Sequence, residues 1–268
     1  MRNYLTVLAI LLGPVLMWGQ QYHTKQASLP CLNKEFNVVA HIVRDSLGEL
    51  NITEEKIDSA IMLLNERFEP MCVSFKLCDV RIIDNFQYDN SENENEWTEM
   101  EVKYLVERRI NIFYVQSIPW TEIQDACGLA PVGGISDTEG DHNSILAVKE
   151  CPINALVHEM GHFFGLYHTF ETEFGEELVD GSNCETAGDL VCDTPADPYV
   201  INTPAENYVD EEQGCRFIDG SSDANGAPYI PHVANIMSYY QDACLCGFTH
   251  GQFLRMAATY LQAPAEYW

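Results

Sequence analysis

The sequence predicts an α+β domain in which an α/β amino-terminal half precedes an irregular, cysteine-rich carboxy-terminal half. Three observations indicate this class. Residues 36–83 have the pattern of a strand, a helix and a second strand, and residues 152–165 have the pattern of another helix. Beyond Phe170 the chain is rich in Gly, Pro, Asp, Asn and Cys and has little periodicity. A strand–helix–strand order favours two parallel strands joined by a crossover helix.

The first elements follow from the spacing of apolar residues. Two β-branched runs, 36–43 and 72–83, predict strands. Between them, residues 54–68 carry apolar side chains at helical spacing, and Thr53 is the expected N-cap of that helix. The stretch 89–102 is acidic and polar, so we expect a surface loop there.

Further strands are expected at 110–115 and 143–150, and the turn-rich segment between them has room for an irregular edge strand. Pro152 suits the first position of the helix that follows. After the irregular region, residues 249–261 predict a final helix. A cleft between the two halves is the expected place for a functional site.

The first twenty residues have the pattern of an export signal. Arg2 supplies the positive charge, and the apolar stretch that follows is short for a membrane-spanning helix. We expect cleavage near Gly19 to Gln21, with an uncleaved anchor as the alternative, and we expect no other membrane span. The mature protein is then expected to be secreted or periplasmic.

The chain carries ten cysteines and a formal charge of −27. An even number of cysteines in an exported chain favours disulfide bonds over thiol chemistry. Because phosphate binding needs Lys and Arg, we expect neither nucleic acid nor anionic membrane as a partner. The acidic balance suits metal cations or cationic polypeptides, and a merely solvated acidic surface is the alternative.

Chemistry is expected at the segment HEMGHFFGLYH, which begins at His158. His158 and His162 stand at i and i+4, so both imidazoles can reach one metal ion. Glu159 is rotated by about 100° and can reach a water on that metal but cannot serve as a ligand. On a continued helix His168 would lie about 9 Å beyond His162. We therefore expect Gly165 to take a positive φ and turn the chain, so that His168 joins the pair.

Three histidines leave the fourth tetrahedral position of zinc open, which is typical of catalytic rather than structural sites. Zinc lowers the pKa of a bound water to about 7 and polarises a carbonyl group. Glu159 is expected to act as the general base that takes a proton from this water and passes it to the leaving amine. The motif predicts hydrolysis of peptide bonds without a covalent intermediate.

Four stretches in this order resemble the metzincin metallopeptidases, and among them the pappalysin family with its ulilysin-like, cytophagalysin-type members. The stretches are HEMGHFFGLYHTF, GDLVCDTP, NIMSYYQDAC and FTHGQFLRM. The resemblance covers roughly residues 36–262 and implies a metzincin fold, with a twisted mixed sheet and the zinc helix above an irregular subdomain. The implied divisions are a signal peptide (1–20), a short segment (21–35), an upper subdomain (36–165) and a lower subdomain with the final helix (166–268).

The resemblance also assigns roles to three residues that follow the histidines. It places Met237 as the hydrophobic floor beneath the zinc and Tyr239 as a hydrogen-bond donor to the oxyanion of the tetrahedral intermediate. It places Asp242 in the pocket for the side chain after the scissile bond, where a carboxylate favours Arg or Lys. Judged on residue type alone, Tyr239 is also compatible with a core aromatic, and Asp242 with a loop aspartate or calcium ligand.

A structural Ca²⁺ site is implied as well, with Asp189, Thr194 and the Cys192 carbonyl as ligands, although a network of turns is an alternative for these residues. The implied disulfides of the lower half join Cys184 to Cys215 and Cys192 to Cys244. Cys31 is expected in a structural disulfide, with a zinc-blocking thiolate as the alternative.

Two further points concern the pairing of the cysteines and the residues of the methionine turn. Cys72 and Cys78 lie about 20 Å apart along one strand and should not pair with each other. Ser238 stands where the resemblance implies an acidic residue inside the methionine turn.

The sequence as a whole predicts a secreted zinc endopeptidase acting on polypeptides. The alternatives are an inactive metzincin-like module that binds peptides, which the presence of Glu159 disfavours, and a structural protein with surface histidines.

Overall fold

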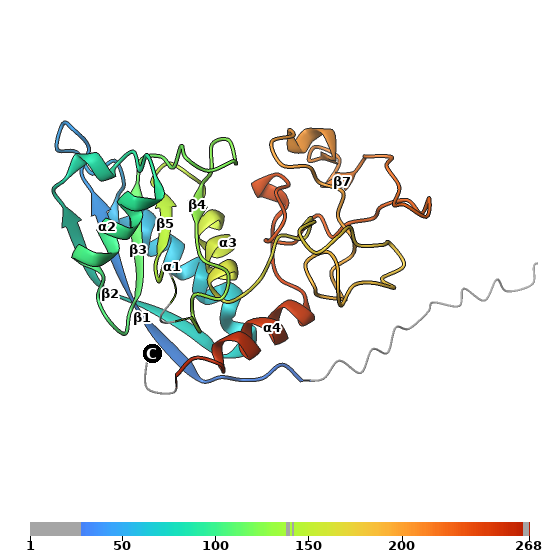
Figure 1. The fold of residues 1–268 in the computed structure, drawn as a ribbon, viewed down its shortest axis with the longest axis horizontal. Helices are drawn as coiled ribbons and strands as arrows, with labels where there is room; N and C mark the ends of the chain where they lie inside the picture. The colour runs from blue at the N-terminus through green and yellow to red at the C-terminus, as the bar shows by residue number, and fades with distance from the viewer. Residues whose placement is uncertain (1–27, 138–139, 141, 265–267) are drawn as a thin grey trace, which may run out of the picture.

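A computed structural model describes residues 28–137, 140, 142–264 and 268 of the chain. The α/β half lies on one side of the molecule and the irregular half on the other (Figure 1). The export signal expected at residues 1–20 lies outside the described residues. Among the residues described, no helix combines the length and the apolar character needed to cross a membrane.

A five-stranded mixed sheet forms the centre of the α/β half. Its strands are β1 (Lys34–Val43), β2 (Val73–Ile83), β3 (Ile110–Val115), β4 (Gly128–Leu129) and β5 (Ile145–Val148). The order is β2-β1-β3-β5-β4, and β4 is antiparallel to β5 while the other pairs are parallel. The four predicted strands and the parallel pairing of the first two are confirmed, and the irregular edge strand is the two-residue β4.

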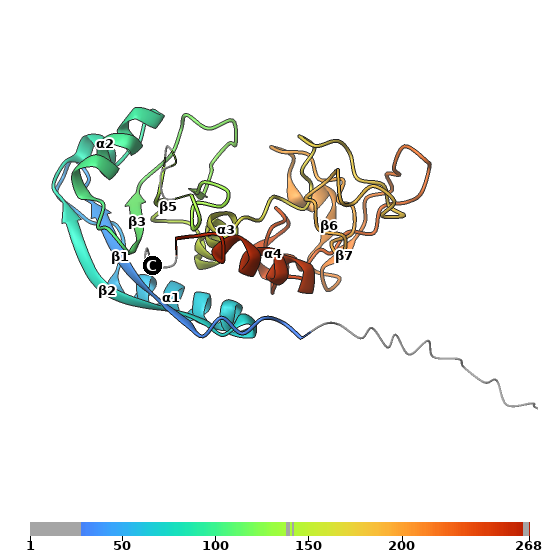
Figure 2. The ribbon, with the colours of Figure 1, turned by 60° about the horizontal axis from the view of Figure 1, so that its bottom comes forward.

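Helices cover both faces of this sheet. The helices α1 (Glu54–Phe68) and α3 (Ile153–Phe163) pack on one face, and α2 (Glu94–Tyr104) packs on the other (Figure 2). Successive side chains of β3 point to opposite faces of the sheet. Ile112 therefore packs in the core with α1 and α3, whereas Phe113 packs in the core with α2. The last helix, α4 (His250–Tyr260), adds Phe253 and Met256 to the larger core.

The helix ends follow from local hydrogen bonding. The Thr53 side chain accepts a hydrogen bond from the Lys56 backbone N–H, which confirms the predicted cap of α1. Thr249 and Gln252 form a reciprocal capping box at the start of α4. Pro152 lies at the N-cap of α3, one residue before the predicted position. Short 3-10 helices lie at η1 (Glu69–Met71), η2 (Phe86–Tyr88), η3 (Ala205–Asn207) and η4 (Asp242–Cys244).

The surface loop predicted at 89–102 is wrong for most of its length, because α2 begins at Glu94. Trp97 and Met100 are three residues apart and are both buried against the sheet. The Trp97 indole also donates to Ser144 Oγ at 2.8 Å. Packing of one apolar face therefore stabilises this helix despite its acidic composition.

The irregular half has one small hairpin, formed by β6 (Val209–Asp210) and β7 (Arg216–Phe217). Four disulfides are present among the described residues: Cys31–Cys72, Cys127–Cys151, Cys184–Cys192 and Cys215–Cys244. Cys31 is therefore in a structural disulfide, and Cys72 does not pair with Cys78. Cys78 and Cys246 are free and exposed.

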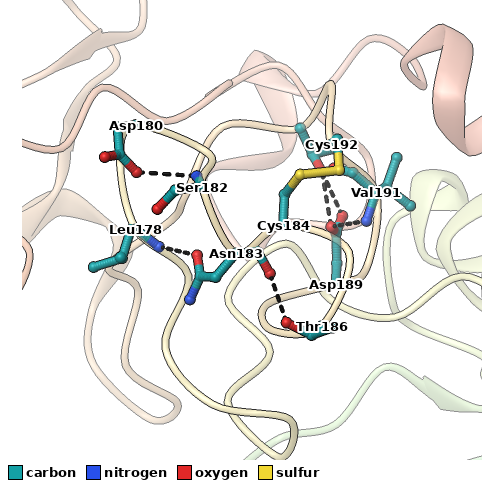
Figure 3. The surroundings of a disulfide bond; sticks show 10 residues. Leu178, Asp180, Ser182, Asn183, Cys184, Thr186, Asp189, Val191 and Cys192 are labelled. Carbon is teal, nitrogen blue, oxygen red and sulfur yellow. Dashed lines mark hydrogen bonds between the residues drawn. A yellow bond between two sulfur atoms is a disulfide. The ribbon is translucent and has the colours of Figure 1, made fainter.

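The predicted pairing of the lower disulfides, Cys184 with Cys215 and Cys192 with Cys244, is wrong. Cys184 instead pairs with Cys192, eight residues along the chain (Figure 3). Gly188 and Leu190 have φ values of 62° and 61°, and these left-handed residues turn the segment back until the two Cα atoms are 5.0 Å apart. Such a turn within eight residues satisfies the geometry of a disulfide locally.

Candidate active site

The three histidines of the motif converge on one point. His158 Nε2 and His162 Nε2 are 3.0 Å apart, and His168 Nε2 lies 3.0 Å from His162 Nε2 and 3.2 Å from His158 Nε2. Three nitrogens bound tetrahedrally to zinc at 2.0–2.1 Å would lie about 3.3 Å from one another. The spacing of the cluster therefore fits one zinc ion.

The other ring nitrogens orient two of the imidazoles. His158 Nδ1 lies 2.7 Å from the Ile236 carbonyl, and His162 Nδ1 lies 2.8 Å from the Leu166 carbonyl. Donation from Nδ1 leaves each Nε2 free as a metal ligand. Burial lowers the pKa of His158 to about 3 and that of His162 to about 4, so both rings are neutral at pH 7, as metal binding requires.

A turn after α3 brings in the third histidine. Gly165 has a φ of 95°, which confirms the predicted left-handed conformation, and its N–H donates to the His162 carbonyl at 2.7 Å. A Cβ atom at this position would also meet the Thr259 hydroxyl of α4 at 2.5 Å. The turn therefore depends on glycine for conformation and for space, and it redirects the chain so that His168 faces α3.

Glu159 lies beside the cluster in a confined position. Its side chain is only 7% exposed, and burial raises its pKa to about 8. A cation at the histidines would act in the opposite direction, because it favours the carboxylate. Gly128 of β4 lies directly against this side chain, since a Cβ at Gly128 would be 2.5 Å from Glu159 Cγ. The edge strand therefore fixes one side of Glu159.

Met237 lies beneath α3 and is fully buried. A Cβ at Gly161 would be 2.5 Å from Met237 Sδ, so the absence of a side chain there lets the sulfur approach the helix between the two histidines. The Met237 backbone N–H donates to Asn235 Oδ1 at 2.9 Å, and its carbonyl accepts from the Thr169 N–H at 3.1 Å. The methionine turn is thereby attached to the segment that carries His168.

The Tyr239 ring also belongs to this cluster. Its centroid lies 4.7 Å from that of His168 and 5.4 Å from that of His158. Burial and the nearby Glu159 carboxyl raise the pKa of Tyr239, so the phenol keeps its proton at neutral pH. A neutral hydrogen-bond donor consequently lies next to the histidines.

A cavity of about 280 Å³ opens beside these groups, between the two halves of the chain. Glu159, His158 and Tyr239 line it, together with residues 123–128 of the α/β half and the exposed residue Asp242. Asn154 at the start of α3 lies close to Asp242, with its Nδ2 donating to the Asp242 carbonyl at 3.5 Å. The structure thus brings Asp242 to the same cavity as the predicted catalytic group.

One contact between the halves was not found from the sequence. Asn202 Oδ1 accepts from the Gln124 N–H at 2.8 Å, and Asn202 Nδ2 donates to the Glu122 carbonyl at 3.0 Å. This bridge holds the loop that forms one wall of the cavity. A single asparagine 80 residues from its partner gives no sequence pattern that could have predicted it.

The residues assigned to calcium form a compact group of oxygens. Thr194 Oγ1 lies 2.8 Å from both Asp189 carboxylate oxygens and also contacts the Val191 carbonyl. The Val191 carbonyl therefore belongs to this group of oxygens together with Asp189 and Thr194, and the Cys192 carbonyl stays a predicted ligand. Glu177, which could not be recognised from the sequence, is 7% exposed, and its Oε2 has no hydrogen-bond partner among the described residues. Burial and the nearby Asp189 carboxylate raise the pKa of Glu177.

Two protein-family models match overlapping parts of the chain. Residues 141–261 match the peptidase M43 model, described as pregnancy-associated plasma protein-A, and residues 54–169 match a reprolysin-like model of metallopeptidase family M12B. The two matches overlap at the histidine motif.

Similar proteins agree with these families. The chain is 27% identical over 240 residues to an extracellular metalloprotease of Pyricularia oryzae, covering 85% of this chain and 74% of that protein. It is 26% identical over 253 residues to one of Neurospora crassa, covering 86% and 76%. The solved structure of mirolysin in complex with compound 9 has the same fold, with a TM-score of 0.58 at 19% identity over 87% of this chain and 92% of that one. The chain is a zinc metalloendopeptidase, and its residues 141–261 are similar to the peptidase M43 family.

Proposed function

We propose that this metallopeptidase is a secreted endopeptidase in which His158, His162 and His168 bind one Zn²⁺ and Glu159 is the general base and acid. The observation that carries the proposal is the convergence of three Nε2 atoms beside Glu159 in one cavity. Secretion is supported by the four disulfides and by relatives named extracellular metalloproteases.

When bound, zinc polarises the scissile carbonyl and lowers the pKa of the attacking water to about 7. Glu159 accepts the proton of that water on a carboxylate oxygen as the water oxygen bonds to the carbonyl carbon. The Tyr239 phenol donates a hydrogen bond to the carbonyl oxygen as negative charge develops on it. Glu159 then returns the proton to the leaving nitrogen as the C–N bond breaks, and a carboxylic acid and an amine result.

The direct test is proteolysis by the purified protein, prepared without chelators. We expect about one zinc per chain by elemental analysis and cleavage of an unstructured protein substrate at neutral pH with calcium present. Cleavage should stop on treatment with a zinc chelator and return when zinc is restored. A protein that holds its zinc but cuts no member of a broad peptide library would instead be a peptide-binding module.

Asp242 is proposed to select Arg or Lys after the scissile bond, because this exposed acidic residue lines the cavity beside Glu159. Replacing Asp242 with asparagine is expected to reduce kcat/KM for substrates with Arg or Lys at this position by about tenfold or more, the size of one charge-assisted hydrogen bond. Cleavage before apolar residues should change little. Cleavage-site profiling of both proteins on one peptide library measures this preference.

Asp125 provides the matched control, because it is also exposed and lines the same cavity. The Asp125→Asn variant should keep the preference for basic residues. If instead this variant loses the preference and Asp242→Asn keeps it, the selecting carboxylate has been assigned to the wrong residue.

A structural calcium ion is proposed at Asp189, Thr194 and the Val191 carbonyl, with Glu177 as an additional ligand. One hydroxyl proton cannot serve the three oxygens around Thr194 Oγ1 at once, and a hard cation stabilises such an arrangement. Burial raises the pKa of Asp189 to about 7, and burial together with Asp189 raises that of Glu177 to about 7. Two neighbouring buried carboxyls, each with a raised pKa, support a bound cation here.

Calcium is expected to raise the Tm, and the rise should be larger at pH 8 than at pH 5. The raised pKa values mean that without calcium these carboxyls favour folding below about pH 4 and that this contribution is lost as pH rises through about 7. Calcium binds the charged forms and reverses the loss. At 100 times Kd it contributes about 2.7 kcal/mol, which corresponds to a Tm increase on the order of 5–10 °C.

Differential scanning calorimetry with zinc held saturating measures the calcium effect. Asp189→Asn should abolish the rise, whereas Asp180→Asn, a change of an exposed carboxylate nearby, should preserve it. An equal calcium response in wild type and Asp189→Asn would place the cation elsewhere.

A further inference from the structure

Asp197 receives four hydrogen bonds from three separate parts of the chain. Its Oδ2 accepts from Thr169 Oγ1 at 2.7 Å and from Ser238 Oγ at 3.1 Å, and its Oδ1 accepts from Tyr240 Oη at 2.6 Å. The Tyr199 backbone N–H donates to Oδ1 at 3.1 Å. No other carboxylate among the described residues connects these segments.

Three of these donors adjoin a group of the proposed active site. Thr169 directly follows His168, and its N–H also donates to the carbonyl of the methionine turn. Ser238 and Tyr240 stand on either side of Tyr239. Because both flanking side chains reach one carboxylate, the backbone that carries Tyr239 is held on both sides while its ring packs against His168.

We propose that Asp197 is a positioning residue that fixes Tyr239 and His168 relative to each other. The inference rests on the proposed function of those two groups, because Asp197 has no hydrogen bond to any of the three histidines or to Glu159. Hydrogen bonds to a charged acceptor are stronger and shorter than those between neutral groups, so a carboxylate suits this role better than an amide. Residues that hold the groups around a metal site, without touching the metal, commonly change metal affinity and activity 10–100-fold.

The arrangement also accounts for the serine in the methionine turn. An acidic residue was expected at position 238, and the structure instead has the Asp197 carboxylate beside this serine, with its Oδ2 3.1 Å from Ser238 Oγ. Asp197 is only partly exposed, and its removal from water raises its pKa while the hydrogen bonds from Tyr240 and Thr169 act in the opposite direction. The four donors therefore offset the cost of placing a charge at this site.

Asp223 offers a matched control for a purely structural role. It is a buried aspartate of the same half, and its carboxylate accepts hydrogen bonds from the backbone N–H groups of Val179, Asn225 and Ala227 at 2.9 Å each. None of these donors adjoins a group of the proposed site. Substitution of either aspartate should lower the Tm, but only substitution of Asp197 should alter the chemistry.

The test compares Asp197→Asn with Asp223→Asn by steady-state kinetics and by zinc competition against a chelator. For Asp197→Asn we expect kcat to fall about 10–100-fold with KM within a factor of two or three, and zinc affinity to fall about tenfold. Asp223→Asn should keep both kcat and zinc affinity. Equal effects of the two substitutions on kcat and on zinc affinity would overturn the proposal.

A double-mutant cycle shows whether Asp197 acts through Tyr239. Tyr239→Phe removes the phenol and should itself lower kcat about 10²-fold. Adding Asp197→Asn to this variant should cost less than about threefold more, because the group being positioned is already gone. Multiplicative effects would mean that Asp197 does not act through Tyr239, and the proposal would then be wrong.

Two further measurements distinguish a failure of this proposal from misfolding of the variant and from a failure of the proposed function. If Asp197→Asn does not fold, the exchange variant Asp197→Asn with Ser238→Asp returns a carboxylate to the same place, and it should fold with kcat within about tenfold of wild type. A folded exchange variant without activity contradicts the proposal. If wild type itself cleaves nothing, the proposed function fails, but the difference in zinc affinity between Asp197→Asn and Asp223→Asn still tests the positioning of His168.

Discussion

Replacing Glu159 with glutamine is expected to lower kcat/KM by about 10²–10⁴-fold, the usual contribution of a positioned general base. Glutamine has nearly the same shape as glutamate, so the contact with Gly128 and the packing of α3 should be retained. It cannot accept the proton of the attacking water, and the loss should therefore appear in kcat with little change in KM. Zinc content should stay equal to that of wild type, because Glu159 is outside the histidine cluster.

Glu101→Gln is a suitable control for this substitution. Glu101 is also a shielded glutamate, but it lies on α2, across the sheet from the histidines, and its carboxylate accepts from the Asn143 N–H at 2.8 Å. This variant should lose some stability and keep its kcat. Full activity in Glu159→Gln would show that another group takes the proton, whereas wild type that binds zinc and cleaves nothing would favour the peptide-binding alternative.

The sequence predicted those parts of the fold that depend on local pattern. Strands such as β3 are mostly apolar runs bounded by polar residues, and they were placed to within about two residues. The left-handed turn at Gly165 could also be predicted, because a straight helix cannot bring His168 back to His162. The helix α2 could not, since its two buried side chains lie in a segment whose acidic composition resembles a loop.

Contacts between distant segments explain most of what the sequence did not reveal. The disulfide pairing depends on how the chain turns at Gly188 and Leu190, and nothing in the spacing of cysteines fixes that turn. Asp197 and Asn202 have ordinary loop surroundings in the sequence, and their partners become visible only in three dimensions. The groups proposed to perform the chemistry could therefore be predicted from the sequence, whereas the groups proposed to position them could not.

Replacing His168 with alanine is expected to abolish zinc binding at submicromolar metal and to abolish proteolysis with it. The remaining histidines would leave zinc with two protein ligands, fewer than the three of known catalytic sites. Because ligand binding stabilises only the folded state, the variant should also lose the increase in Tm that zinc gives to wild type. Zinc titration followed by competition with a chelator measures the first effect, and calorimetry with and without zinc measures the second.

His142→Ala separates loss of a ligand from loss of a buried histidine. The His142 ring stacks on Trp97 at 3.8 Å and its Nδ1 lies 3.0 Å from Glu101, so its removal should cost stability without altering zinc affinity. Gly165→Ala should give an intermediate result, because a side chain there meets Thr259 and opposes the left-handed turn while the imidazole of His168 is retained. Equal zinc affinity in His168→Ala and wild type would show that His168 is not a zinc ligand. The turn at Gly165 would then have no role in zinc binding.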